Sequence, residues 1–102
     1  MRLLDWDIFN KKYIEKAYEV VGEWEINIGG QNIFIKVMKD KLGKYVYKSS
    51  HYYLGTHSSL YIAVETEFET IDDAVREAVK DKLRYYDPED FDSIWVINGD
   101  YF

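Results

Sequence analysis

The residue types best suited to chemistry are crowded into residues 45–64 of this 102-residue chain, YVYKSSHYYLGTHSSLYIAV, which hold five tyrosines and both histidines. His51 and His57 would make an incomplete zinc site, because structural zinc takes four protein ligands and catalytic zinc takes three. The neighbouring serines lack the G-x-S-x-G context of a hydrolase nucleophile. We therefore expect no metal, no cofactor and no catalytic residues, and predict that the protein is not an enzyme.

The tyrosines are better suited to binding than to catalysis. In the sheet predicted below, Phe34, Tyr45, Tyr47 and Tyr61 are expected to share the face turned away from the helices. Aromatic rings on a sheet can stack on nucleobases, and a lysine-rich turn accompanies these rings. The same rings can cover a strand surface with no ligand at all, or pair two copies of the chain. A nucleic-acid-binding face and a self-associating homodimer therefore stay open as alternatives.

Acidic residues dominate the C-terminal third of the chain. Residues 1–64 carry nine Lys and Arg against seven acids, whereas residues 65–102 carry four against twelve, and the net charge is −6. Proteins hold nucleic acids mainly through Lys and Arg that neutralise phosphates, so this third of the chain should repel them. Direct binding of nucleic acid is therefore not expected.

Two rows of carboxylates flank a predicted helix in this acidic third. The row after the helix, in DPEDFD at residues 87–92, opposes the helix dipole, so we interpret it as serving binding rather than local stability. We predict a non-catalytic domain whose acidic edge docks on a basic surface of a partner protein, with aromatic side chains supplying most of the binding energy. The predicted partner-binding residues are Glu65, Glu67, Glu69, Asp87, Glu89 and Asp90, with Tyr61, Phe91 and Trp95 as aromatic anchors.

In size, acidity, lack of cysteine and aromatic content, the chain resembles the small phage-encoded inhibitors that block nucleic-acid-binding immune proteins, the anti-CRISPR class among them. The resemblance is one of composition and of rows of carboxylates. It implies an inhibitor that acts as a nucleic-acid mimic, and a partner whose basic surface normally holds nucleic acid.

Two helices are predicted to position these residues. In residues 5–20, DWDIFNKKYIEKAYEV, apolar side chains recur at steps of three and four, and Gly22 follows as a terminator. A second helix begins at the capping residue Thr70 and stops before Pro88. Its predicted buried stripe is Ile71, Val75, Ala78, Val79 and Leu83.

Strands are predicted between and after the helices. Residues 23–28 and 33–37 alternate apolar and polar side chains around Gly29–Gly30, the pattern of a tight hairpin. Turns are expected at Gly43 and in HYYLGTHSS around Gly55, a strand over residues 59–68, and a final strand in SIWVIN, either at an edge of the sheet or within it. The predicted fold is a single α+β domain, residues 1–102, with an antiparallel sheet of about four to five strands and both helices on one face. The predicted core joins Trp24, Ile26, Ile35, Ile62, Val75 and Leu83.

The chain has no cysteine, no apolar run of the length a signal peptide needs, and no stretch approaching the roughly 20 apolar residues of a membrane span. These features predict a cytoplasmic protein that does not enter a membrane.

Overall fold

The structure is a computed structural model that describes residues 16–56 and 66–102. Within these ranges the fold is α+β and consists mostly of strand. Five strands and one α-helix are followed by a short 3-10 helix, η2. In chain order the elements are β1 (Tyr18–Ile28), β2 (Gln31–Asp40), β3 (Tyr45–Ser49), β4 (His51–Leu54), α1 (Ile71–Leu83), β5 (Ile94–Ile97) and η2 (Gly99–Tyr101).

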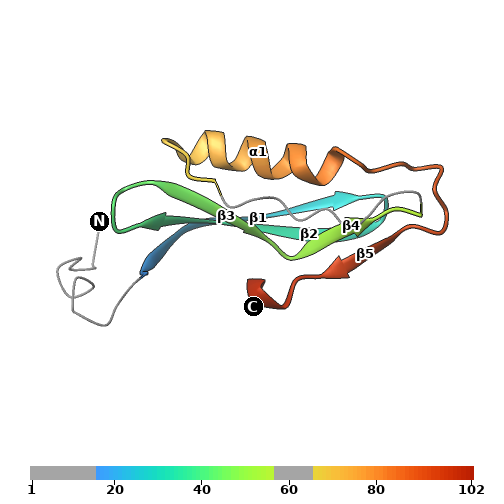
Figure 1. Cartoon of the computed structure of the whole chain (residues 1–102), viewed down its shortest axis with the longest axis horizontal. Helices are drawn as coiled ribbons and strands as arrows, with labels where there is room; N and C mark the ends of the chain where they lie inside the picture. The colour runs from blue at the N-terminus through green and yellow to red at the C-terminus, as the bar shows by residue number, and fades with distance from the viewer. Residues whose placement is uncertain (1–15, 57–65) are drawn as a thin grey trace.

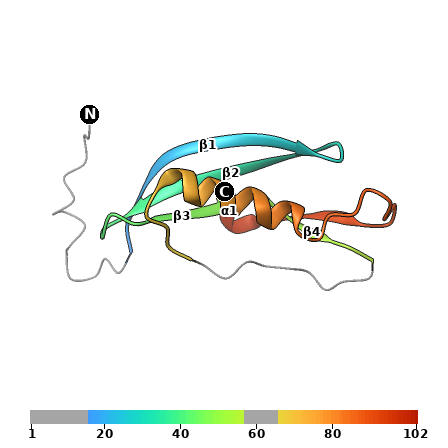
Figure 2. The ribbon, with the colours of Figure 1, turned by 90° about the horizontal axis from the view of Figure 1, so that it is seen from above.

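The strands form two antiparallel sheets. The larger sheet has the order β1-β2-β3, and the smaller one consists of β4 and β5. The helix α1 runs along one face of the larger sheet, and the C-terminal segment with β5 and η2 lies on its other side (Figure 1). Seen from the helix side, α1 lies over β2 and β3 and leaves β1 beside it (Figure 2), in agreement with its contacts to β2 and β3.

The predicted architecture of two helices on one sheet is wrong. The described residues contain one α-helix, and their strands divide into two sheets instead of joining one. Residues 18–20 of the predicted N-terminal helix belong to β1, where Tyr18 pairs with Asp40 and Val20 with Met38. Residues 5–15 of that prediction lie outside the described part of the chain.

Gly22 extends the hairpin instead of ending a helix. The register of β1 against β2 shifts between Val20 and Gly22, so the strand continues past this position through a bulge. A Cβ atom on Gly22 would lie 2.4 Å from the Trp24 ring. The glycine therefore makes room for the indole, a packing role that the local sequence does not distinguish from helix termination.

Two predicted turns and the start of the helix are confirmed. Gly29 and Gly30 have φ values of +60° and +88°, as expected of a hairpin turn with two left-handed central residues, and Gly43 has a φ of +83°. At the start of α1, the Thr70 hydroxyl accepts a hydrogen bond from the backbone N–H of Asp73 at 3.1 Å. This bond satisfies one of the N–H groups that have no partner within the helix.

The buried face of α1 differs from the predicted stripe. The helix buries Ala74, Ala78, Asp81 and Lys82, whereas Leu83 is 51% exposed. Two alanines allow the helix backbone to lie close to the sheet, and the two charged residues are accommodated by polar groups at its edge. Periodicity identified the helix but assigned the wrong face to its last turn.

The core lies between α1 and the middle of the larger sheet. Its centre is made of side chains with no exposed surface: Ile33, Ile35, Val37, Ala74 and Ala78. Ile35 confirms the prediction, Ile26 and Val75 are half-buried, and Ile62 lies outside the described residues. Trp24 and Leu83 were predicted to be buried and are exposed. For Trp24 the reason is that β1 lies beyond the strands that α1 covers.

The strand β4 occupies part of a predicted turn, since residues 51–54 pair with β5. Ser50 separates β3 from β4, and its side chain and backbone both bond to Phe34: Oγ accepts from the Phe34 N–H at 2.9 Å, and the Ser50 N–H donates to the Phe34 carbonyl at 2.9 Å. Asn98, after β5, donates from its side chain to the Ser49 carbonyl at 2.9 Å. The final strand therefore joins a second sheet that Ser50 and Asn98 tie to the first.

Candidate functional site

The structure places the predicted acidic residues in two groups. Glu67 and Glu69 are exposed just before α1, whereas Asp87, Glu89 and Asp90 follow it. A helix of 13 residues spans about 20 Å, so the two groups lie toward opposite ends of α1 (Figure 1). Glu65 and Tyr61 lie outside the described residues. Within the described part, the predicted edge is therefore two separate acidic surfaces.

Part of the acidic turn after α1 has a structural role. The Asp87 carboxylate accepts a hydrogen bond from the Glu89 N–H at 2.9 Å, and the Asp87 N–H donates to the Tyr53 hydroxyl at 3.2 Å. At the other end of the helix, Glu69 forms an ion pair with Lys44. The hydrogen bond that Lys44 donates to Glu69 is the largest of several causes that raise the pKa of Lys44.

The predicted aromatic face is also divided. Tyr47 pairs with Val37 across β2 and β3, and paired residues point to the same side of a sheet. Tyr45 and Tyr47 therefore share the face that α1 covers, whereas Phe34 points to the opposite face. The Tyr47 hydroxyl also donates a hydrogen bond to the carboxylate of Asp81 on α1. This bond links β3 to the helix.

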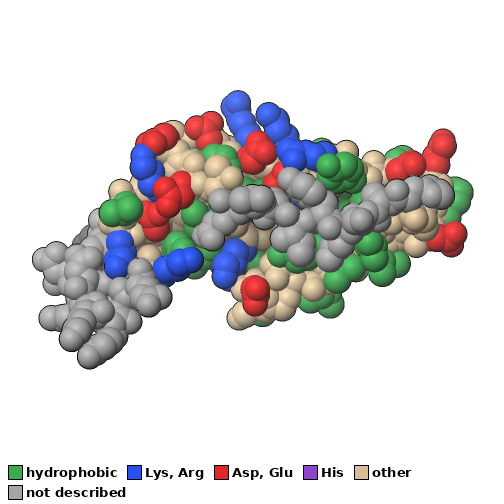
Figure 3. All heavy atoms as spheres, in the orientation of Figure 1, with side chains coloured by type: hydrophobic (Ala, Val, Ile, Leu, Met, Phe, Trp, Pro, Cys, Tyr) green, Lys and Arg blue, Asp and Glu red, His purple; other side chains and the backbone are tan. Residues whose placement is uncertain are grey.

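A different apolar surface stands out around β5. Ile94 is 55% exposed and Ile97 is 66% exposed, although both belong to a strand. Successive side chains of a strand point to opposite faces, so these two isoleucines lie on the two faces of β5. Phe91 is 92% exposed in the turn before the strand. Hydrophobic side chains gather around β4 and β5 in Figure 3.

Trp95, a predicted anchor, is packed against its neighbours. Its ring centroid lies 5.0 Å from that of Tyr53 and 6.1 Å from that of Tyr86. These aromatic contacts hold β5 against β4 and the segment after α1. Trp95 therefore stiffens the strand on which Ile94 and Ile97 are displayed.

The edge of β5 lacks the usual protection against pairing. Edge strands commonly carry charges, proline or a bulge that discourages another strand from adding. The edge strand β1 has three glutamates and the bulge near Gly22. The four residues of β5, Ile-Trp-Val-Ile, carry none of these features, and within the described part of the chain β4 is the only strand hydrogen-bonded to β5.

The electrostatic surroundings of β5 are acidic. Residues 85–102 contain five carboxylates and no Lys or Arg: Asp87, Glu89, Asp90, Asp92 and Asp100. Acidic side chains appear in Figure 3 at the end of the molecule that holds the turn between α1 and β5. An exposed aliphatic strand edge within an acidic surface is thus the arrangement that the structure adds to the sequence.

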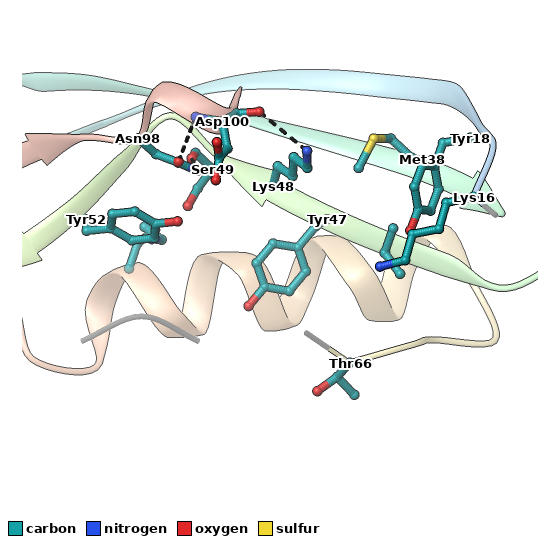
Figure 4. Close-up of a pocket in the computed structure, with 12 residues that line it drawn as sticks. Lys16, Tyr18, Met38, Tyr47, Lys48, Ser49, Tyr52, Thr66, Asn98 and Asp100 are labelled. Carbon is teal, nitrogen blue, oxygen red and sulfur yellow. Dashed lines mark hydrogen bonds between the residues drawn. The ribbon is translucent and has the colours of Figure 1, made fainter. Parts of the chain in front are cut away.

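A second site is a cavity of about 310 Å³ at the outer edge of β3. Lys82 from α1 is one of the residues that line it. Figure 4 shows Lys48 from β3 and tyrosines from three strands in the same lining. Burial lowers the pKa of Lys82 to about 8, while the negative charge of Asp81 acts in the opposite direction. Burial raises the pKa of the Asp81 carboxyl, against the effects of Arg84 and Lys82.

The sequence interpretation missed Ile94, Ile97 and Lys82. A signal for the isoleucines was present, because SIWVIN contains no charged residue within the strand. Lys82 was left out of the predicted stripe because it is charged, although it lies four positions after Ala78 and so on the same face of the helix. Only the seating of the helix on the sheet places it beside a cavity.

Comparisons with protein-family models, with curated proteins and with solved structures find no match for this chain. In residues 16–56 and 66–102, no cluster of three or more His, Cys, Asp or Glu side chains could hold a metal ion. No helix in the described residues is both long enough and apolar enough to cross a membrane.

Proposed function

We propose that this protein is a non-catalytic protein-binding domain, and that β5 accepts an extended, basic segment of a partner protein as an added strand. The observation that carries the proposal is the exposure of Ile94 and Ile97 on both faces of an edge strand that has no protecting charge, proline or bulge. Strand addition supplies main-chain hydrogen bonds, and the alternating side chains give specificity.

The small sheet would gain stability from a third strand. A two-stranded hairpin is marginally stable at best without further packing, whereas three strands with an apolar face can be stable. A strand placed beside β5 would cover parts of Ile94 and Ile97 together, because its own side chains alternate between the same two faces. The partner segment should therefore carry aliphatic side chains.

The charges favour a basic partner. The surrounding carboxylates Asp87, Glu89 and Asp92 are exposed, and opposite charges around an interface accelerate association and select partners. The same charges oppose self-association through β5, because two copies would bring their acidic turns together. A partner with a basic surface is the class that the sequence predicts, and an inhibitor acting in the cytoplasm on a nucleic-acid-binding protein is one form of it.

The alternative in which the tyrosine-rich sheet face binds nucleic acid has less support. Tyr47 is committed to Asp81, and Phe34 points to the opposite side of the sheet from Tyr45 and Tyr47. These residues therefore offer no common stacking platform among the described strands.

The test begins with display-based selection of random extended peptides on the purified wild-type protein. Selected peptides are expected to combine basic and aliphatic residues and, in NMR titrations, to shift and protect the backbone amides of β5. The double substitution Ile94→Ala and Ile97→Ala should weaken binding at least about tenfold, because it removes exposed apolar contacts. The matched control is Leu42→Ala, a similarly exposed aliphatic side chain in the turn between β2 and β3, which should leave affinity unchanged.

Two results would contradict the proposal. Peptides that bind the double variant and wild type equally well would place the binding surface elsewhere. A wild-type dimer in light scattering that the double variant converts to monomer would show that β5 pairs with a second copy of the chain, and the self-associating alternative would replace the proposed one.

A further inference from the structure

The cavity beside β3 combines positive charge with aromatic walls. Among the described residues, it is lined by the lysines Lys16, Lys48 and Lys82 and by one carboxylate residue, Asp100. Tyrosines from β1, β3 and β4 also contribute, namely Tyr18, Tyr47 and Tyr52. Its volume of about 310 Å³ falls at the lower end of the range of roughly 300 to 1,000 Å³ typical of small-ligand pockets.

We propose that this cavity binds a small anion that carries a planar ring, of the chemical class of a nucleoside monophosphate, with its phosphate held by Lys82 and Lys48. The ring would lie against Tyr47 and Tyr52, whereas Tyr18 lines the far end of the cavity (Figure 4). The site is separate from the β5 edge, so this inference does not depend on the proposed protein-binding function.

Lys82 is the residue around which the proposal is built. Its side chain is buried, and its Nζ donates a hydrogen bond to the His51 carbonyl at 2.9 Å and lies 5.0 Å from the centre of the Tyr52 ring. An ammonium group has three donors. The carbonyl accepts from one of them and the ring face attracts the charge, so the group retains capacity to donate to an anion in the cavity.

The surroundings of Lys82 leave its charge incompletely balanced. A buried ammonium is costly unless it is paired and hydrogen-bonded. The acid whose charge acts on Lys82 is Asp81. Its carboxylate accepts a hydrogen bond from Tyr47 and lies 3.2 Å from the Arg84 guanidinium, so several groups share its negative charge. Burial lowers the pKa of Lys82 to about 8, which is above neutral pH, so the ammonium group is mostly charged there. A phosphate would supply the missing negative charge.

The second lysine already points along the cavity wall. Lys48 Nζ lies 3.4 Å from the backbone carbonyl of Asp100, as Figure 4 shows. This long contact to an uncharged acceptor is weaker than a charge-assisted bond to phosphate. Lys48 is exposed at its β3 position and can reorient toward a ligand without unfolding.

The tyrosines favour a ligand with a ring over a bare phosphate ion. Tyrosine faces stack on nucleobases with roughly 1 to 3 kcal/mol per base. A free mononucleotide fits the charge distribution better than a nucleic-acid strand, because the exposed carboxylates of residues 85–102 would repel the further phosphates of a strand.

The experiment is isothermal titration calorimetry of the full chain with four probes: uridine monophosphate, adenosine monophosphate, inorganic phosphate and uridine. The monophosphates should bind, phosphate alone should bind more weakly, and uridine should bind weakest, because it lacks the anion. A single-stranded oligonucleotide is titrated as a further probe, and it should bind no more tightly than the monophosphate. Binding of the oligonucleotide alone would overturn the proposal in favour of nucleic-acid recognition.

Substitutions assign the site. Lys82→Met should weaken monophosphate binding at least about tenfold, the loss expected for a charge-assisted hydrogen bond, and Lys48→Ala should weaken it as well. Lys41→Ala, in the turn between β2 and β3, is the matched charge control and should have no effect. Circular dichroism verifies that each variant is folded. If Lys82→Met does not fold, NMR shifts of Tyr47, Tyr52 and Lys48 in the titrated wild type decide the question.

The pH dependence gives a readout that a purely structural lysine would not produce. Affinity for the monophosphate should fall as pH rises above about 8, where Lys82 loses its proton, and the fall should be absent in Lys82→Arg because arginine stays charged. The titratable groups next to Lys82 are Asp81 on α1 and His51 and Tyr52 on β4. Lys48 and Asp100 line the same cavity. The absence of monophosphate binding, or equal binding by wild type and Lys82→Met, would overturn the proposal.

Discussion

The carboxylate of Asp90 holds Thr56 by two hydrogen bonds, one from the Thr56 backbone N–H at 2.8 Å and one from its hydroxyl at 2.7 Å. These bonds tie the turn before β5 to the end of β4, across 34 positions of sequence. The acidic turn therefore contributes to local stability, which the sequence interpretation of residues 87–92 had not assigned to it.

Repulsion by the helix dipole alone would make removal of the Asp90 carboxylate stabilising. The hydrogen bonds to Thr56 predict that the removal is destabilising. Asp90→Ala removes both acceptors and should lower the free energy of unfolding by about 1 to 3 kcal/mol, measured by urea denaturation. Glu89→Gln neutralises an exposed carboxylate in the same turn and should change stability by less than about 0.5 kcal/mol. Equal effects of the two substitutions would show that net charge, and not the Thr56 contact, governs this turn.

The position of α1 predicts that alanine substitutions at Ile35 and at Leu83 lower the free energy of unfolding by different amounts, although the sequence placed both residues in one core. Ile35 has no exposed surface, whereas Leu83 is half-exposed. Ile35→Ala should cost about 2 to 5 kcal/mol, the range for removing a buried aliphatic side chain, and Leu83→Ala should cost less than about 1 kcal/mol. Both values come from the same denaturant titration. A larger loss at Leu83 would support the helix face predicted from periodicity.

Lys82 predicts a specific pH dependence of stability. Its pKa falls from 10.5 in the unfolded chain to about 8 in the folded protein. Between these values the unfolded state holds a proton that the folded state has lost, so stability should rise as pH increases from about 8 toward 10.5. The full shift corresponds to something on the order of 3 kcal/mol.

The measurement compares the free energy of unfolding of wild type and Lys82→Met at several pH values across this window. The difference between them should change with pH, because the methionine variant lacks the titrating group while other groups are shared. A difference that stays constant through the window would contradict the lowered pKa. No nucleotide is added, so that ligand binding does not contribute.

The two glycines of the hairpin turn should respond differently to alanine. A Cβ on Gly29 would lie 2.2 Å from the Tyr86 hydroxyl, whereas one on Gly30 would meet no atom within 4 Å. Tyr86 has little freedom to move away, because its ring packs at 5.5 Å from Tyr53 and at 6.1 Å from Trp95.

Gly30→Ala should therefore show mainly the backbone cost of a left-handed residue, about 1 to 2 kcal/mol. Gly29→Ala should show that cost and the displacement of Tyr86, visible as a changed near-ultraviolet circular dichroism spectrum. Similar stabilities and unchanged spectra for both variants would mean that the hairpin tip does not rest on Tyr86.

The local features of this protein were determined by the sequence. Gly29, Gly30 and Gly43 take left-handed backbone conformations that side chains disfavour, and alternation around them predicted β1 and β2. Thr70 predicted the start of α1 because its hydroxyl acts on an N–H only three residues away. The run of carboxylates with no Lys or Arg in residues 85–102 is likewise a property of the sequence itself.

The tertiary structure decided the features that depend on contacts between residues far apart in the chain. Residues 18–20 have apolar spacing compatible with a helix, but pairing with residues 38–40 makes them a strand, because an extended ladder satisfies their backbone groups at that distance. The same holds for the buried face of α1, which depends on how closely Ala74 and Ala78 approach the sheet. Burial of Lys82, exposure of Ile94 and Ile97, and the bond from Asp90 to Thr56 all follow from this packing, because each depends on contacts between segments that are distant in the sequence.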